Sequence, residues 1–169
     1  PDVKNCNQLI YYDVSVNNFI GDVGIFNSTA LTSIDVSGNK LDGIIADDVL
    51  IKTNNQVAIS MKFNKLVGTI PSSLFVSGLI VLDLSSNFLS GTIPKEIINS
   101  NPHVQQIILS KNLLSGILPT ELNGAQFSDL FKFSKAFFRT FWLTWTFSSF
   151  SSHFSAAVSS SLEHKNISI

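Results

Sequence analysis

The sequence has one cysteine, few charged residues and no excess of either charge. Cys6 has no second cysteine to pair with, so an intramolecular disulfide is excluded. Lysine and arginine number 11 against 12 aspartate and glutamate residues, and a net charge of −1 gives no electrostatic case for binding nucleic acid or an anionic membrane. Charged residues make up only 14% of the chain and the mean hydropathy is +0.29, which is unusually apolar for a free soluble protein.

Residues that carry out chemistry are also scarce. His103, His153 and His164 lie far apart, and the H-E-x-x-H, G-x-S-x-G, Walker A and glycine-rich kinase-loop motifs are all missing from the sequence. Serine is abundant toward the C-terminus, but serine without a partnered base is not a nucleophile. We therefore expect no catalytic residue, no metal site and no cofactor.

What the sequence does contain is a repeat. Leu79–Pro94 reads LIVLDLSSNFLSGTIP, with apolar residues at positions 1, 4, 6, 11 and 15, asparagine at 9, glycine at 13 and proline at 16. The same template fits copies that start at Leu9, Leu31, Gln56 and Val104, although Gln56 is a weak first position. Successive starts are 22, 25, 23 and 25 residues apart, within the roughly 20–29 residues of one repeat class.

The template predicts how each copy folds. Apolar residues at positions 4 and 6, such as Leu82 and Leu84, predict a short strand with these side chains turned inward. Successive strands can bury those side chains only by stacking in parallel. The predicted fold is therefore a solenoid, a curved right-handed coil with a parallel β-sheet on its concave face and short 3-10, loop or helical connections on its convex face.

Asparagine at position 9 follows each strand, where the chain bends away. Its amide can satisfy backbone groups that the bend leaves unpaired, so we expect a buried ladder of asparagines; a ligand-binding row is the alternative. The ladder consists of Asn17, Asn39, Asn64, Asn87 and Asn112. Glycine at position 13 permits tight backbone geometry, and proline at position 16 fixes φ where the chain leaves the turn.

With this set of template residues, the chain resembles the plant-type leucine-rich repeat ectodomains of receptor-like kinases and receptor-like proteins. Polygalacturonase-inhibiting proteins have the same repeat. The L-x-G-x-I-P-like segments at residues 66–71, 89–94 and 114–119 carry the resemblance. The cap cysteines, signal peptide, membrane span and kinase domain of that family are not visible here. Pro1 lies eight residues before Leu9, as Pro71 lies before Leu79, so we expect a fragment that begins inside an earlier, partial repeat.

The resemblance implies recognition through the outward side chains of the concave strands. The candidate contact residues are Tyr11, Asp13, Ser33, Asp35, Ser60, Lys62, Phe63, Asp83, Ser85, Gln106, Ile108 and Ser110. Tyr11 and Phe63 are expected to be the energetic anchors, because aromatic side chains dominate binding hot spots. Stacking aligns Asp13 and Asp35, with Asp83 two turns beyond, in a partial acidic row that either contacts a ligand or solvates the strand surface.

Two classes of function follow. The first is a recognition module of a plant cell-surface receptor, which binds a protein, a peptide or a small extracellular ligand, with a co-receptor as a further partner, at the plasma membrane or in the cell wall. The second is a truncated or mis-spliced product without independent function; a secreted inhibitor of a cell-wall-degrading enzyme is a further alternative. A membrane contact would come through a missing span or weakly through the C-terminal tail, and kinase activity would belong to a missing domain.

The composition changes near Ala125. All nine glycines and all five prolines precede it, whereas Phe127–Phe154 contains nine of the fourteen phenylalanines and both tryptophans. A sixth copy begun at Phe127 would place Lys132 and Lys135 where leucine and asparagine belong, so we expect repeats over residues 1–125 and a tail over residues 126–169. The tail is interpreted as read-through or frame-shifted sequence, as a helix that caps the last repeat or lies on a membrane, or as a membrane span.

Three further residues are candidates for modification or reactivity. Asn27 and Asn166 each begin an N-glycosylation sequon, and Asn27 falls in the convex lead-in to the second copy, where a glycan would be tolerated. Cys6 lies in the lead-in to the first copy, where we expect a small buried apolar residue, with a reactive thiol as the alternative.

Overall fold

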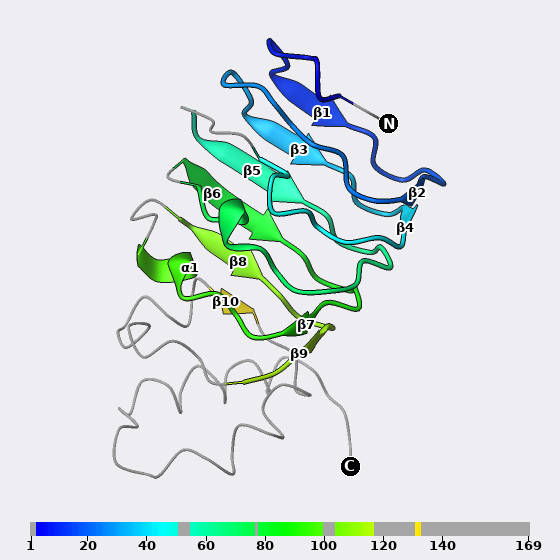
Figure 1. Cartoon of the computed structure of the whole chain (residues 1–169), viewed down its shortest axis with the longest axis vertical. Helices are drawn as coiled ribbons and strands as arrows, with labels where there is room; N and C mark the ends of the chain where they lie inside the picture. The colour runs from blue at the N-terminus through cyan, green and yellow to red at the C-terminus, as the bar shows by residue number, and fades with distance from the viewer. Residues whose placement is uncertain (1–2, 51–54, 77, 100–103, 117–130, 133–169) are drawn as a thin grey trace, which may run out of the picture.

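The computed structural model describes residues 3–50, 55–76, 78–99, 104–116 and 131–132. The five copies form turns one to five of a solenoid, and each turn adds one strand to a parallel sheet whose sixth strand follows the fifth turn (Figure 1). In spatial order the strands are β1 (Tyr11–Asp13), β3 (Ser33–Asp35), β5 (Val57–Ser60), β6 (Leu79–Asp83), β8 (Gln106–Ile108) and β10 (Phe131–Lys132). The predicted solenoid and its parallel sheet are confirmed.

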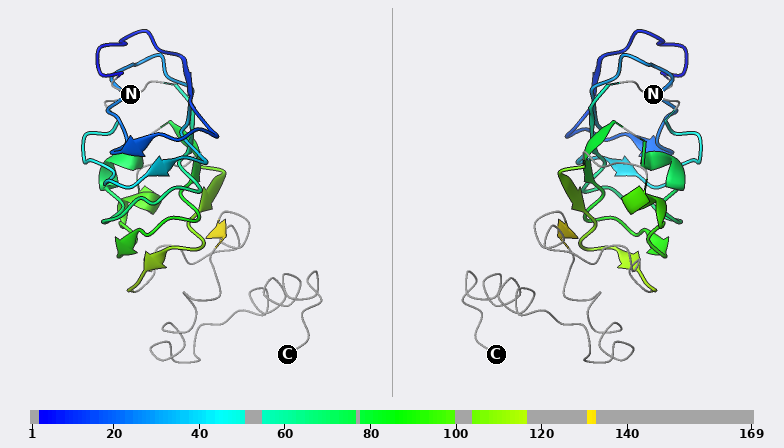
Figure 2. Two further views of the ribbon diagram at one scale, coloured as in Figure 1. Left: turned by 90° about the vertical axis from the view of Figure 1, so that its right-hand side faces the viewer. Right: turned by 90° about the vertical axis from the view of Figure 1, so that its left-hand side faces the viewer.

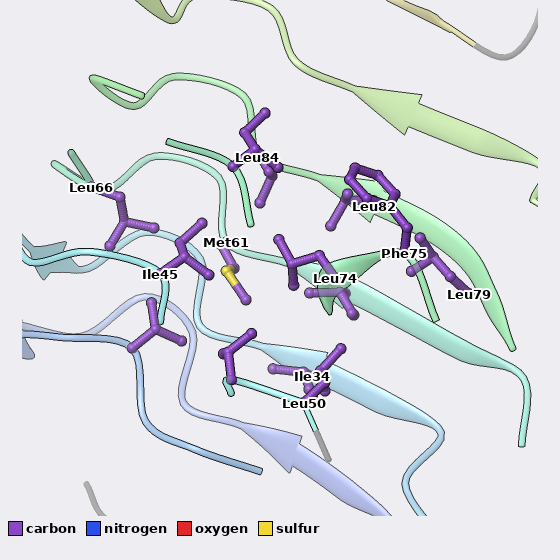
Figure 3. Close-up of a cluster of buried hydrophobic side chains, with 14 of the residues drawn as sticks. Ile34, Ile45, Leu50, Met61, Leu66, Leu74, Phe75, Leu79, Leu82 and Leu84 are labelled. Atoms are coloured by element: carbon purple, nitrogen blue, oxygen red, sulfur yellow. The ribbon is translucent and has the colours of Figure 1, made fainter. Parts of the chain in front are cut away.

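The core lies directly behind this sheet. The inward side chains at template position 4 are Cα partners from strand to strand, in the series Tyr12, Ile34, Ile59, Leu82 and Ile107. The last four are fully buried, and burial of each such side chain contributes about 1.5–3 kcal/mol. Figure 3 shows the strand residues packed together with Leu74, which comes from the convex side.

Two further features complete each turn. On the convex side, the 3-10 helix η1 (Ser72–Leu74) follows Pro71 and the short helix α1 (Glu96–Asn99) follows Pro94. Beside the main sheet, β2 (Ile20–Gly21) pairs in parallel with β4 (Lys40–Leu41), and β7 (Ser90–Gly91) pairs in parallel with β9 (Leu113–Leu114). We call this second set of strands the lateral ladder; Figure 2 (left) shows its strands stacked one above another.

The glycine at position 13 has a steric role in the lateral ladder. Gly91 has a φ of +79°, and a Cβ added there would lie 2.9 Å from Cγ2 of Thr69 in the preceding turn. A larger residue would therefore be strained twice, by the left-handed backbone and by contact with the neighbouring turn. The template glycine thus lets successive turns approach each other closely.

The sheet extends beyond residue 125, where the sequence predicted that the repeats end. Strand β10 pairs in parallel with β8, with Phe131 opposite Ile107 and Lys132 opposite Ile108. In this register the template would begin at Ser128, one residue later than the register tried in the sequence, with Phe131 on position 4. The asparagine of position 9 and the glycine of position 13 are not present in that register. The other predictions for the tail lie outside the described residues.

Two local expectations were also wrong. In turn three, Val57 and not Gln56 fills the first apolar position: Val57 is buried opposite Leu79, and the register shifts between Val57 and Ala58. The extra residue of a β-bulge accommodates this shift in register, so the exposed Gln56 does not interrupt the stacking of the turns. Cys6 is exposed and not buried, because it lies between two tight turns ahead of β1, where its N–H donates to Val3 and its carbonyl accepts from Leu9.

Candidate functional site

The concave face of the sheet brings the candidate residues into aligned rows. At position 3 the outward residues are, in order, Tyr11, Ser33, Ala58, Val81 and Gln106. At position 5 they are Asp13, Asp35, Ser60, Asp83 and Ile108. The strand register therefore places most predicted contact residues on one continuous surface, which we call the concave surface.

The three aspartates of the position 5 row share a structural role. Oδ1 of Asp13, Asp35 and Asp83 accepts a hydrogen bond from the backbone N–H of the serine two residues later, at 2.9, 2.8 and 3.0 Å. This local bond stabilises the bend at the end of the strand. In turn one the bond from Ser15 lowers the pKa of Asp13, because it favours the charged carboxylate. The acidic row is therefore more than a solvating surface.

The aspartates differ in what else they contact. Asp83 is buried, accepts a 2.6 Å hydrogen bond from the Ser85 hydroxyl and lies 3.8 Å from Nζ of Lys62. Asp13 and Asp35 are direct Cα partners on neighbouring strands, so two carboxyl groups lie side by side, and Asp13 is exposed. Carboxylates placed so close repel each other, and a cationic group of a partner would relieve that repulsion.

Large apolar side chains rise from the same surface. Tyr11 is 71% exposed, Phe63 is 57% exposed and Val16 is 83% exposed. Val16 and Phe63 both have a φ of +54°, and the equivalent residue of every other turn also has a positive φ. A β-branched residue in this conformation is strained, which singles out Val16. The sequence alone gave no reason to treat Val16 as an anchor, because its backbone conformation follows from the bend.

The asparagine ladder forms, with one exception. Nδ2 of Asn87 donates to the carbonyl oxygens of Leu84 and Ser85 in its own turn and of Met61 in the preceding turn, and its Oδ1 accepts the N–H of Leu66. Equivalent bonds link Asn39, Asn64 and Asn112 to the turns before them. Asn17 is exposed and donates only within its own turn, to Val14 and Ser15. The expectation that Asn17 is buried was therefore wrong, since no described turn precedes it.

The remaining candidates are small or partly covered. Ser33, Ser60, Gln106, Ile108 and Ser110 are half-buried, and Ser85 is buried. The Oγ atom of Ser60 is buried without a hydrogen-bond partner, between Asp35 and Asp83 in the register. The middle of the concave surface is therefore lined by small side chains, with Tyr11 in turn one and Phe63 just after the strand of turn three.

The repeats can now be compared with known proteins. The sequence profile described as Leucine Rich Repeat matches residues 30–50 and 78–100, which contain the second and fourth copies. The chain is a leucine-rich repeat solenoid. It is 35% identical over 96 residues to the S-cell enriched with leucine-rich repeat-containing protein slrA of Dictyostelium discoideum, and 35% identical over 90 residues to Cuscuta receptor 1 of Solanum lycopersicum.

A solved structure has the same fold. The Arabidopsis receptor kinase HAESA, crystallised in complex with the peptide hormone IDA and the co-receptor SERK1, aligns with a TM-score of 0.51 and 24% identity over 78% of this chain and 27% of the HAESA chain. The matches to the two curated relatives cover 56% and 51% of this chain. They span only 7% and 8% of the lengths of those relatives.

The other candidate sites lie away from the concave surface. Asn27 is half-buried on the side of turn two, next to Phe26, which forms a bridge with Leu50. The hydroxyl of Ser28 in the same sequon is engaged with the carbonyl oxygens of Asn7 and Leu9. Asn166 lies outside the described residues. Within the described ranges there is no group of three or more His, Cys, Asp or Glu residues that could hold a metal ion, and no helix that is long and apolar enough to cross a membrane.

Proposed function

We propose that the solenoid is a non-catalytic recognition module that binds a peptide or protein partner through its concave surface, on the extracellular side of a plant receptor. The observation that carries the proposal is the juxtaposition on turns one and two. There the highly exposed Tyr11 is the Cα partner of the small Ser33, and Asp13 is the Cα partner of Asp35. An exposed aromatic ring beside a small residue and two carboxylates can take an apolar and a cationic side chain of one partner.

The similarity to known proteins supports this class of partner. Cuscuta receptor 1 is named as a receptor, and the HAESA structure contains a peptide hormone and a co-receptor. For the solenoid we propose a peptide as the first partner, because the small residues Ser33 and Ala58 leave the surface open beside Tyr11. A co-receptor would be a second partner of the longer protein.

Selection from a displayed library of random twelve-residue peptides tests the proposal. Peptides enriched on the full chain are measured by fluorescence polarisation against Tyr11→Ala and Phe63→Ala, which remove exposed side chains and should leave the fold intact. Loss of a hot spot costs about 2 kcal/mol or more, so we expect affinity to fall about thirtyfold for at least one of the two variants.

Lys95→Ala, an exposed change on the convex side, serves as the matched control and should leave the affinity unchanged. Peptides that bind equally well to both concave variants would contradict the proposed surface. A chain that unfolds cooperatively but enriches no peptide would favour the alternative of a product without independent function.

A further inference from the structure

One row of the concave surface carries large apolar side chains that the fold does not need. Template position 8 directly precedes the ladder asparagine, and in turns one to five it is Val16, Gly38, Phe63, Ser86 and Lys111. Val16 and Phe63 are exposed, and neither side chain belongs to the buried core. We call Val16, Gly38 and Phe63 the position 8 triplet.

The backbone makes two members of the triplet costly. All five residues of the row have a positive φ, between +54° and +64°. Glycine adopts this conformation freely, whereas a bulky or β-branched residue is strained in it. Val16 and Phe63 therefore add strain without adding to the core. Strained residues and exposed apolar side chains both concentrate at binding sites, so we infer contact with a partner here.

Hydrogen bonds between consecutive turns align the triplet. The amide of Val16 donates to the carbonyl oxygen of Ser37 at 2.8 Å, and the amide of Gly38 donates to that of Lys62 at 3.0 Å. Because paired strands are about 4.8 Å apart, Val16 and Phe63 lie roughly 10 Å apart with Gly38 between them. A Cβ built on Gly38 would meet its nearest atoms, those of Val16, at 3.5 Å. An apolar side chain of a partner can therefore lie over Gly38 and contact both neighbours.

The charges beside the triplet indicate what else the partner carries. Asp13 and Asp35 are Cα partners and lie three residues before the first two members of the triplet. Lys62 is the counter-ion of Asp83, at 3.8 Å. Among the residues that the structure describes, neither Asp13 nor Asp35 has such a counter-ion. A basic side chain of the partner would complement these two carboxylates.

We propose that the concave surface selects an extended peptide in which a lysine or arginine is two residues from a large apolar residue. The apolar side chain lies over Gly38 and the basic one at Asp13 and Asp35. This inference rests on the proposed function and adds the sequence that the partner must carry.

The spacing follows from strand geometry. Side chains two residues apart in an extended peptide point to the same face and are about 6.7 Å apart. Three residues of the solenoid separate the aspartates from the triplet, a span of at most about 11 Å, and the length of a basic side chain covers the difference. A peptide spacing of four residues would be about 13 Å and too long.

The sequences of selected peptides give the first test. Peptides from the random library that bind the full chain should be enriched in this pattern, in either chain direction. Replacing the apolar residue of such a peptide by alanine should weaken binding at least about tenfold. Replacing its basic residue by glutamine should weaken binding about twofold to fivefold. Binding peptides without the pattern overturn the proposal.

Gly38→Asn tests where the apolar side chain lies. Asparagine tolerates the left-handed backbone, and its side chain occupies the place over residue 38. We expect affinity for the selected peptides to fall at least about tenfold. Ser86→Asn is the matched control, since Ser86 has a φ of +56° and follows Phe63 in the same row, outside the triplet. An unchanged affinity for Gly38→Asn, or an equal loss for both variants, overturns the proposal.

Asp13→Asn tests the charge separately. Asparagine keeps an acceptor for the Ser15 amide, so this variant removes the charge and retains the bend. We expect affinity to fall about twofold to fivefold and to depend less on salt. Asp42→Asn is the control, because Asp42 is exposed and accepts a similar bond from the Gly21 amide at 3.0 Å, beside the lateral ladder. Equal losses for both variants overturn the pairing with a basic residue.

The two proposals fail in different ways. If Tyr11→Ala or Phe63→Ala weakens peptide binding but Gly38→Asn does not, recognition by the concave surface stands and the peptide pattern is wrong. If no peptide binds the full chain, both proposals are wrong.

Discussion

The first turn and the middle turns of the solenoid have the same template residues but use them differently. In turn three, Leu66 at position 11 is fully buried and Asn64 at position 9 is bonded to the turn before it. In turn one, Phe19 at position 11 is 37% exposed, and Asn17 at position 9 bonds only within its own turn. The role of a template residue is therefore set by the turn that precedes it and not by the residue itself.

Because of this difference, we expect the middle turns to stabilise the solenoid and the first turn to contribute more to recognition. The middle turns are packed on both sides and carry the buried core and most of the asparagine ladder. Turn one packs against turn two and carries the most exposed apolar side chains, Val16, Ile20 and Tyr11, together with Asp13. Binding surfaces are commonly drawn from the less stable parts of a protein, and the first turn fits that description.

The largest expected effect comes from replacing the asparagine at position 9 with alanine, once in a middle turn and once in turn one. Asn87→Ala leaves the buried Leu66 amide without its acceptor, at about 1–3 kcal/mol, and removes one of the hydrogen bonds that the Met61 and Leu84 carbonyl groups accept, at about 0.5–1.5 kcal/mol each. We expect the free energy of unfolding in urea to fall by about 3 kcal/mol or more. Asn17→Ala should cost less than about 1 kcal/mol, because water can replace the lost bonds. Equal losses for the two variants would remove the distinction between the turns.

Smaller effects are expected from substitutions at position 8 of turns one and two, where the backbone is left-handed. Val16 and Gly38 both have a positive φ, +54° and +64°. Gly38→Val should destabilise by about 2 kcal/mol through the backbone alone, since its Cβ would meet Val16 atoms no closer than 3.5 Å. Val16→Asn should stabilise by about 1 kcal/mol, because asparagine tolerates this conformation. Thermal unfolding of both variants measures the difference, and a destabilised Val16→Asn would show that Val16 is not strained.

The smallest effect is a pH dependence that comes from Asp13 in turn one. The bond from Ser15 lowers the pKa of Asp13 from its ordinary value of 3.8. The charged carboxylate therefore stabilises the folded state above that value, and this contribution is lost as the pH falls through the lowered folded-state pKa. We expect 13C NMR of the Asp13 carboxyl to show a midpoint below 3.8. Asp13→Asn keeps an acceptor and should remove this acid-dependent component; a midpoint above 3.8 would contradict the hydrogen bond.

The sequence predicted the parts of the fold that follow from periodicity. Ile34, Ile59 and Leu82 face the core because their positions recur with the repeat, and their burial needs only the next turn. It could not predict the exposure of Asn17, which depends on a neighbour and not on a motif. It also missed β10, because the sequence around this strand lacks the asparagine and glycine of the template.

The candidate surface was predictable only in outline. The template gives the outward strand positions, so Tyr11, Asp13 and Asp35 could be placed side by side before the structure was known. The bonds from the serines to the preceding aspartates and the strain at Val16 depend on backbone geometry. Both arise where the chain bends after each strand, and the template predicts that bend at the asparagine but not its dihedral angles or hydrogen bonds.

Native-state hydrogen exchange compares the two regions most directly, at equivalent backbone positions. The amides of Val14 and Val16 in turn one donate to Asp35 and Ser37, and those of Met61 and Phe63 in turn three donate to Asp83 and Ser85. All four bonds run from one turn to the next. We predict that Met61 and Phe63 exchange only through global unfolding, whereas Val14 and Val16 exchange faster, through local opening of turn one. Equal protection of all four amides would contradict the account.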